Sequence, residues 1–295
     1  MKMKQIILFA IFSTIIFAQV ATDTRYHGAR QLALAGSDIA WQLDEFAVYH
    51  NPAAGAWQTQ TSIGMSYEKL FGLSYLPHIS TVVSSPFTSF GTTSLSFEQM
   101  SVSYQSKSLS NEMAVGLSQA FFLQKDRNST LSMGFTANYY SVDYGKSAGP
   151  TGDGSDGIDL GSHQTFGLSV GVQASLHETH WVGAWVKNIN SPRIGQANTT
   201  SYLPRSLSVG YSYVPYHLVR THFAMNHALG KVSQYHAGLE YQLLSSLQII
   251  SGVHSNPNRF GFGLRLNVKS MKIDYAILTH PVLPLSQQFT FGIAF

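Results

Sequence analysis

The sequence predicts an all-β fold, a transmembrane antiparallel β-barrel of about fourteen strands with an N-terminal plug segment in its lumen. Three observations support it: apolar and small polar residues alternate along the chain, only 11% of residues are charged, and 15 Tyr and 18 Phe are present. Because successive side chains of a strand point to opposite faces, the alternation gives one apolar and one polar face. An apolar outside with a small-polar inside is typical of an outer-membrane barrel.

The clearest alternation lies in residues 258–295, which end on a phenylalanine. If residues 269–270 form a two-residue turn, the numbers of paired residues add up to 539. This register predicts four contacts on the apolar face and two on the polar face, which are Val268 with Met271, Leu266 with Ile273, Leu264 with Tyr275, Phe262 with Ile277, Asn267 with Lys272, and Arg265 with Asp274.

The same alternation predicts fourteen strand segments, an even number of the kind that bacterial barrels use. The two longest connections, 144–163 and 189–204, are the fifth and the seventh, so both fall on one side, which would be extracellular. The segments are 61–69, 72–84, 91–104, 111–124, 129–143, 164–177, 179–188, 205–214, 218–228, 233–243, 246–254, 258–268, 271–280 and 286–295.

The chain divides into three parts. Residues 1–18 are predicted to be a secretory signal peptide, since two lysines precede a short apolar run that ends at a small residue. Residues 19–58 do not alternate and form the predicted plug, in which residues 37–46 are expected to hold a short helix and Pro52 to stop any helix or strand. Residues 59–295 form the barrel. No apolar run after the signal reaches the roughly 18 residues of a membrane helix.

Composition excludes several classes of function. Without the two lysines of the signal, 16 basic residues remain against 15 acidic ones, so no electrostatic argument favours nucleic acid binding. The chain has no cysteine, which excludes disulfides and lipid attachment through a thiol. No Gly-x-Ser-x-Gly elbow or other catalytic constellation is present, and we therefore expect neither an enzyme nor a cofactor.

Five residues are candidates for the plug and the lumen. Arg265 and Asp274 face the polar side, where they either line a ligand site or, as we favour, brace the wall against the plug. Arg30 and Asn51, with Pro52 beside the latter, either gate a substrate path or satisfy buried backbone groups of the plug.

Two further groups of residues have a simple explanation beside a functional one. Asp153, Asp156 and Asp159 have the oxygen spacing of a calcium site but lack the bidentate Glu of an EF-hand, and Asp-rich and Gly-rich turns are common for conformational reasons, so no metal site is predicted. Trp57, Trp181 and Trp185 would suggest ligand stacking, but in a barrel such residues more often form the interfacial girdles.

Four groups of residues occur in an order known from one family of barrels. They are Gly28-Ala29-Arg30 with Ala33 to Gly36 and Asn51-Pro52-Ala53; Lys187-Asn188-Ile189 with Ser191-Pro192-Arg193-Ile194; Tyr202-Leu203-Pro204-Arg205-Ser206-Leu207 with Val209-Gly210-Tyr211-Ser212-Tyr213; and Gly238-Leu239-Glu240-Tyr241 with Asn258-Arg259-Phe260, Gly263-Leu264-Arg265 and Asp274-Tyr275-Ala276. The set resembles the PorV/PorQ family of FadL-like outer-membrane barrels, and the PorV type more closely.

The resemblance implies a protein of the bacterial outer membrane, surrounded by its lipid. It implies a docking or shuttle component of type IX secretion, whose partners would be the translocon, cargo proteins and the surface-attachment machinery. The alternative is FadL-like transport of hydrophobic small molecules across the outer membrane. The C-terminal Phe295 resembles the terminal aromatic residue of proteins that the barrel-assembly machinery inserts, and we expect it to act as that assembly signal.

Overall fold

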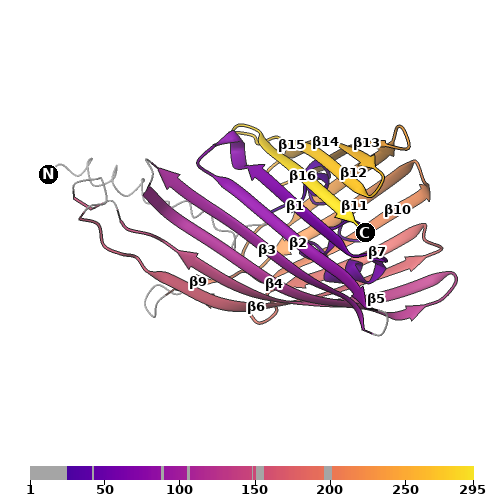
Figure 1. Ribbon diagram of the computed structural model, residues 1–295, viewed down its shortest axis with the longest axis horizontal. Coiled ribbons are helices and arrows are strands. Elements are labelled where there is room, and N and C mark those ends of the chain that lie inside the picture. Colours follow the sequence, from indigo (N-terminus) through magenta and orange to yellow (C-terminus); the bar gives the residue numbers. More distant parts are fainter. Residues whose placement is uncertain are drawn as a thin grey trace.

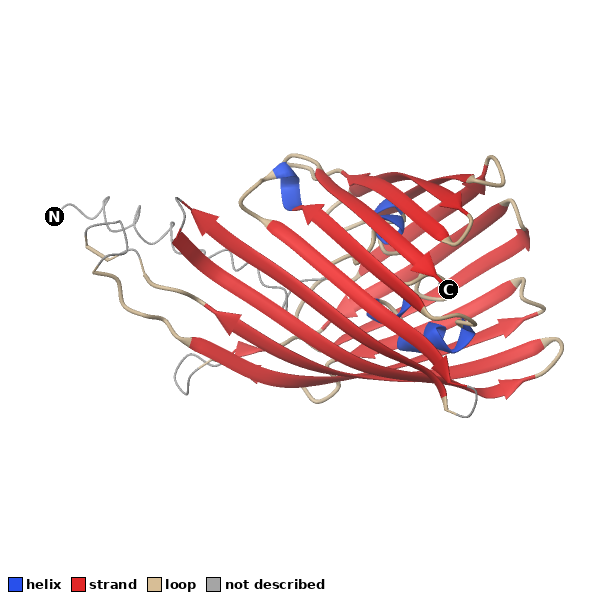
Figure 2. Ribbon diagram, viewed as in Figure 1, coloured by secondary structure: helices blue, strands red, loops and turns tan. Residues whose placement is uncertain are grey.

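The computed structural model describes residues 25–41, 43–87, 90–104, 107–147, 149–150, 156–195 and 201–295. The predicted signal peptide lies outside these residues. Fourteen antiparallel strands form a closed barrel, in which β1 pairs with both β2 and β16 (Figures 1 and 2). The barrel strands are β1 (Ser62–Lys69), β2 (Pro77–Phe87), β3 (Gly91–Tyr104), β4 (Lys107–Lys125), β5 (Ser129–Asp143), β6 (Ser162–Leu176), β7 (His180–Lys187), β10 (Ser206–Tyr216), β11 (Val219–Ala228), β12 (Gln234–Gln242), β13 (Leu247–His254), β14 (Arg259–Val268), β15 (Met271–Leu278) and β16 (Ser286–Ala294).

The predicted strand number is confirmed, with two local differences. Strand β2 begins at Pro77 instead of residue 72, because η3 (Leu70–Gly72) forms a helical turn in which Phe71 has a φ of 52°. The seventh connection holds a two-stranded hairpin of β8 (Arg193–Ile194) and β9 (Ser201–Tyr202), which pair with each other.

The register predicted for the C-terminal hairpin is confirmed, including Leu264 opposite Tyr275 and Arg265 opposite Asp274. Exposure confirms the two faces, since Leu264 is 42% exposed and Arg265 only 8%. The small and polar side chains therefore face the lumen, and the apolar ones cover the outer wall. Among the described residues, no helix is both long and apolar enough to cross a bilayer.

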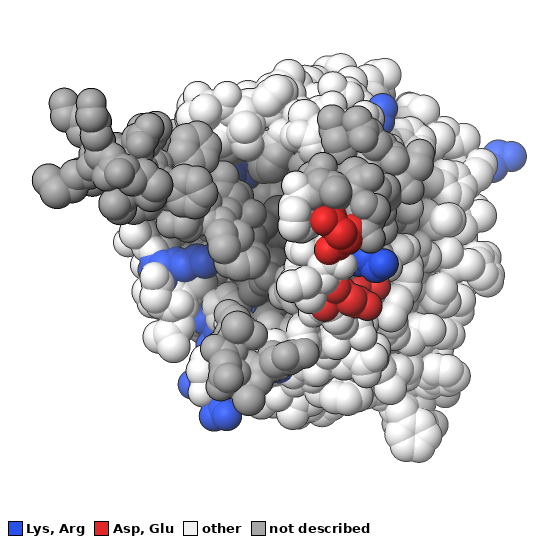
Figure 3. All heavy atoms as spheres, turned by 90° about the vertical axis from the view of Figure 1, so that its left-hand side faces the viewer, with Lys and Arg blue, Asp and Glu red and all other residues white. Residues whose placement is uncertain are grey.

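The two ends of the barrel differ in their connections. At the turn end, strands are joined by short turns, such as 126–128, 217–218 and 269–270. At the loop end lie 144–161 and 188–205, as the alternation predicts. Strands β3 to β6 extend far toward the loop end on one side of the barrel, at the left in Figure 1, and this side is longer than the side of β11 to β16. Seen from the loop end, Asp and Glu side chains gather in one place (Figure 3).

The N-terminal segment, residues 25–58, contacts the inner faces of strands on opposite sides of the barrel. Its helix α2 (Ala29–Ala33) lies against β13 to β16, and its 3₁₀ helix η2 (Pro52–Trp57) lies against β3 to β6. A second short turn, η1 (Ala47–Tyr49), lies between them. The side chains of α2 are fully buried.

One of two predictions for this segment is wrong. The described part of residues 37–46 contains no helix, because the Ser37 hydroxyl donates a hydrogen bond back to the Leu34 carbonyl at 2.9 Å and so lies beyond the end of α2. No helix or strand runs through Pro52, as predicted, since η1 ends at Tyr49; in addition, Pro52 begins η2. It occupies the first turn of η2, where its missing N–H is not needed, and the Asn51 side chain accepts a hydrogen bond from the Ala53 N–H at 3.1 Å.

Candidate functional site in the barrel lumen

Arg30 is the centre of a buried charge cluster. Its guanidinium donates to Asp38 at 2.8 Å and to Glu240 on β12, and it lies 3.5 Å from Asp44. The Trp41 ring lies over the same guanidinium, 5.2 Å from its central carbon. Arg30 is 2% exposed, so its charge is compensated by carboxylates and not by water.

Arg265 joins the wall to the same cluster. It donates two hydrogen bonds to Asp274, at 2.8 and 2.6 Å, as a bidentate pair. A third hydrogen bond, of 3.2 Å, goes to Asp44 of the N-terminal segment. The predicted pair therefore exists, and Asp44 connects it to Arg30.

Burial and arginine charge compete at the two aspartates of the segment. Burial raises the pKa of Asp38 to about 6 although Arg30 is beside it, since that arginine also pairs with Glu240. Burial alone would raise the pKa of Asp44 as well, but the combined charges of Arg30 and Arg265 lower it to about 2. Asp44 thus remains charged and holds the two arginines together.

Asn51 and Pro52 form a different kind of contact with the wall. The Asn51 amide donates to the Ile39 carbonyl at 3.0 Å and to the Val172 carbonyl of β6 at 3.1 Å. A Cβ added at Gly134 of β5 would lie 2.4 Å from the carbonyl carbon of Pro52, so a larger residue would clash. Asn51 therefore satisfies buried backbone groups, one of its two predicted roles.

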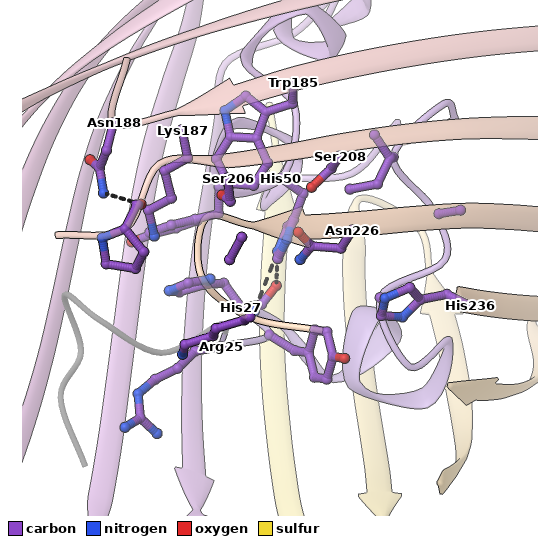
Figure 4. A pocket seen from close by; sticks show the side chains of 18 residues that line it. Arg25, His27, His50, Trp185, Lys187, Asn188, Ser206, Ser208, Asn226 and His236 are labelled. Atoms are coloured by element: carbon purple, nitrogen blue, oxygen red, sulfur yellow. Dashed lines mark hydrogen bonds between the residues drawn. The ribbon is translucent and has the colours of Figure 1, made fainter. Parts of the chain in front are cut away.

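A small cavity of about 50 Å³ lies in the lumen toward the loop end (Figure 4). The N-terminal segment contributes His27 and His50, whose Nε2 lies 3.1 Å from the His27 carbonyl oxygen and 3.3 Å from its backbone nitrogen. The wall contributes the Trp185 ring, Lys187 and polar side chains of β10 and β11. This volume holds only a very few waters.

The wall beside this cavity is incomplete. The pairing of β6 with β7 runs only from Leu176 opposite His180 to Val170 opposite Val186, although β6 continues toward the loop end. Loop residues take the place of the missing strand, since the Ile189 N–H donates to the Leu168 carbonyl at 2.8 Å.

The tryptophans do not form a girdle, contrary to the prediction. Trp181 is 2% exposed and lies 4.7 Å from Trp57, ring centre to ring centre, inside the barrel. Trp185 lines the cavity, and its ring points toward the segment in Figure 4. Residues 181, 183, 185 and 187 lie on the same face of β7. This is the inner face, because a Cβ added at Gly183 would meet residues 39 and 40 of the N-terminal segment.

Two other groups of residues were singled out in the sequence. Asp153 falls outside the described residues, while the Asp159 carboxylate accepts a hydrogen bond from the Gly161 N–H at 2.9 Å, as an ordinary turn does. Phe295 is 67% exposed at the turn end, with its N–H on the Thr61 carbonyl at 2.9 Å. Its role in assembly stays a prediction.

Several lumenal residues escaped the sequence analysis. Glu240, Asp38 and Asp44 belong to the charge cluster, and Glu68, His78 and Glu98 line the inner faces of β1 to β3. The sequence contained a signal for the strand residues among them. Each lies an even number of positions from the small polar residues of its strand, and so on the face opposite to the apolar one. Acidic and histidine side chains at such positions need a partner in the lumen. The identity of that partner depends on contacts distant in sequence.

No known protein family matches the sequence, and no curated protein matches it. Solved structures match the fold. The Pseudomonas putida toluene transporter TodX has a TM-score of 0.62 and 11% identity, covering 93% of this chain and 98% of TodX. A TodX mutant described as a monoaromatic hydrocarbon channel has a TM-score of 0.62 and 13% identity over 91% of this chain and 98% of that one. A Pseudomonas aeruginosa FadL homologue has a TM-score of 0.54 and 10% identity, over 92% and 98% respectively.

The chain shares the fold of these outer-membrane channels. This fold places it among proteins of the bacterial outer membrane. That the loop end faces the outside of the cell stays a prediction, which rests on where bacterial barrels place their long connections. The FadL-like part of the sequence resemblance is therefore confirmed at the level of fold. The specific resemblance to PorV/PorQ finds no support in the matches to solved structures.

Proposed function

We propose that this barrel passes hydrophobic small molecules across the outer membrane, and that its N-terminal segment closes the lumen in the form described here. The fold shared with TodX, a toluene transporter, over 93% of this chain carries the proposal. Type IX docking, the other function considered, rests on the sequence resemblance alone, and the fold comparisons do not support it.

The lumen supports a gated route and not an open pore. Only about 50 Å³ is free at the cavity, well below the roughly 300–1,000 Å³ of a small-molecule site. A substrate therefore needs the N-terminal segment or the loop beside β6 to move. The cavity lies next to the incomplete β6–β7 pairing, where loop residues and not a continuous strand complete the wall.

Uptake by intact cells tests the proposal. A strain that lacks the protein would be compared with the complemented strain for uptake of labelled toluene, a long-chain fatty acid and, as a hydrophilic control, a monosaccharide. We expect complementation to increase uptake of at least one hydrophobic compound and to leave the sugar unchanged. If the two strains took up each compound at the same rate, the proposal would be contradicted. Faster sugar uptake in the complemented strain would indicate a general pore.

A reversible cross-link tests the role of the segment. The chain has no cysteine, so Gly55→Cys with Ala120→Cys would introduce the only thiols. A Cβ at position 55 lies 3.2 Å from that of Ala120 on β4, close to the roughly 3.5–4.5 Å of a disulfide. We expect oxidation to lower hydrophobic uptake and a reductant to restore it. Full uptake in the oxidised form would show that η2 stays in place during passage.

A further inference from the structure

Three buried side chains meet where the N-terminal segment lies against β2 and β3. His27 precedes α2, His78 is the second residue of β2, and Glu98 lies on β3. Their exposed fractions are 4%, 1% and 7%, and one ligand atom of each lies within 4.8 Å of the other two. Two imidazoles and a carboxylate form a donor set that zinc and related divalent metals prefer.

His78 is oriented as a metal ligand would be. Its Nδ1 lies 3.2 Å from a carboxylate oxygen of Glu68, which is itself 2% exposed. The Nδ1–H donates a hydrogen bond to this carboxylate, so in the neutral imidazole Nε2 carries the free lone pair. This Nε2 is buried and has no hydrogen-bond partner. A carboxylate that orients a histidine from its far nitrogen is the usual arrangement behind a metal ligand.

His27 is held in place from the opposite side. Its ring stacks on Tyr49 with the ring centres 4.2 Å apart and the planes 4° from parallel. The Tyr49 hydroxyl in turn contacts the carbonyl oxygens of Thr81 on β2 and Phe97 on β3, both at 2.8 Å. The tyrosine therefore ties His27 to the same two strands that carry His78 and Glu98, so the three groups are preorganised.

An ion pair explains only part of this arrangement. The Nε2 of His27 lies 2.5 Å from a carboxylate oxygen of Glu98, which satisfies those two atoms. The ion pair leaves the buried Nε2 of His78 without a hydrogen-bond partner. An unsatisfied buried nitrogen costs the free energy of its desolvation. A cation between the three groups would give His78 Nε2 a partner while keeping His27 Nε2 and the Glu98 carboxylate satisfied; the buried Nδ1 of His27 lacks a hydrogen-bond partner in either case.

We propose that His27, His78 and Glu98 bind one divalent transition-metal ion of the zinc class, with Glu68 as the residue that orients His78. Two ligands that each lie about 2 Å from one ion are at most about 4 Å apart, so side-chain shifts of about 1 Å bring the three groups into range. The ion fastens the N-terminal segment to β2 and β3. This inference does not depend on what the barrel transports.

The first test is zinc binding by the purified, detergent-solubilised full chain without a polyhistidine tag. After treatment with a chelator and its removal, Zn²⁺ would be titrated in competition with a chromophoric chelator. We expect one tight site per chain. His78→Ala and Glu98→Gln should weaken it at least about 100-fold, and Glu68→Gln about 10- to 100-fold.

His254→Ala is the matched control. His254 is also lumenal, is 5% exposed and has a buried Nε2 without a partner, but it does not belong to the three-residue group. Its substitution should leave zinc affinity unchanged. Equal zinc affinity in the His78→Ala variant and the wild type, or an equal loss in the His254→Ala variant, would overturn the proposal.

X-ray absorption at the zinc edge of the wild-type protein keeps the test decisive if a variant fails to fold. We expect scattering from two imidazoles and from oxygen in the first coordination shell. Absence of a stoichiometric site in the wild type, or a shell without imidazole, would refute the assignment whatever the variants do. Uptake of hydrophobic compounds would be measured separately, so failure of the zinc site and failure of the transport proposal are distinguishable.

Discussion

On the side of β12 to β15 the N-terminal segment is held by buried charges, whereas on the side of β4 to β6 it is held by close backbone contact with glycines. Arg30 meets Glu240 of β12, and Asp44 meets Arg265 of β14. Pro52 and Ala53 meet Gly134 and Gly171, and their polar contacts are to backbone or neutral amide groups. Glycines also lie beneath α2, at positions 252 and 261, so the backbone of the segment approaches the wall closely on both sides. The buried ion pairs described above lie on only one of these two sides.

The difference separates two tasks in docking a segment inside a barrel. Missing Cβ atoms set how closely the backbone can approach, but they do not select one position along the strand. Buried ion pairs do select a position, because every other placement leaves charges without partners in a region of low dielectric constant. The charged side thus determines where the segment lies, and the glycine side allows it to fit.

Arg30→Met should have the largest effect, because it removes the charge that Asp38, Asp44 and Glu240 share. Breaking one partner of a buried ion pair costs about 3–5 kcal/mol. Guanidinium unfolding in detergent would measure this, and limited proteolysis would detect release of the segment. Arg205→Met, at an exposed arginine of the seventh connection, is the control and should change stability by under about 0.5 kcal/mol. Equal stability and equal resistance to proteolysis of the two variants would show that the charge cluster does not hold the segment in place.

Leu264→Arg should have the next largest effect. Leu264 precedes Arg265 on β14 but faces lipid, at 42% exposure. An arginine facing lipid near the bilayer midplane costs about 2–4 kcal/mol, so we expect less assembled protein in the membrane fraction. Leu229→Arg, in a loop where the leucine is 71% exposed, should assemble normally. Normal assembly of the Leu264 variant would mean that the two faces of the wall are assigned the wrong way round.

Gly134→Ala tests the glycine side. The added methyl would lie 2.4 Å from the carbonyl carbon of Pro52 and 2.5 Å from the Ala53 nitrogen, and both are backbone atoms that cannot turn away. We expect a loss of about 1–3 kcal/mol in unfolding experiments. Gly55→Ala is a milder comparison, because its methyl meets only the Ala120 Cβ at 3.2 Å. A loss no greater at position 134 than at 55 would show that η2 adjusts freely.

Deletion of Phe295 should affect stability least. The side chain is 67% exposed and packs against little, so unfolding of the assembled barrel should change by under about 0.5 kcal/mol. We expect instead slower insertion by the barrel-assembly machinery, measured as the heat-modifiable fraction after a pulse of synthesis. The substitution Phe295→Tyr, which keeps a terminal aromatic ring, should insert normally. Unchanged insertion after the deletion would remove the assembly signal.

The wall followed from local pattern, and one error shows how far that pattern reaches. Alternation with a period of two places every residue on one face or the other, and the turn at 269–270 determines the register, so pairs such as Arg265 with Asp274 could be derived. The same parity assigns Trp181 and Trp185 to the inner face of β7. We expected these tryptophans in an interfacial girdle because of their residue type. That prediction was wrong, because the alternation along the strand determines which face of the wall a side chain occupies.

By itself the sequence determined the fold class, the strand number, the register of its C-terminal hairpin and the side with long loops, because each depends on residues that are near one another in the chain. Only the tertiary structure decided where the N-terminal segment lies. Arg30 meets Glu240 across 210 residues, and His27 meets Glu98 across 71. Such partners are selected by the closed shape of the barrel, which brings strands from both ends of the chain around one lumen and leaves each buried charge a single place to be neutralised.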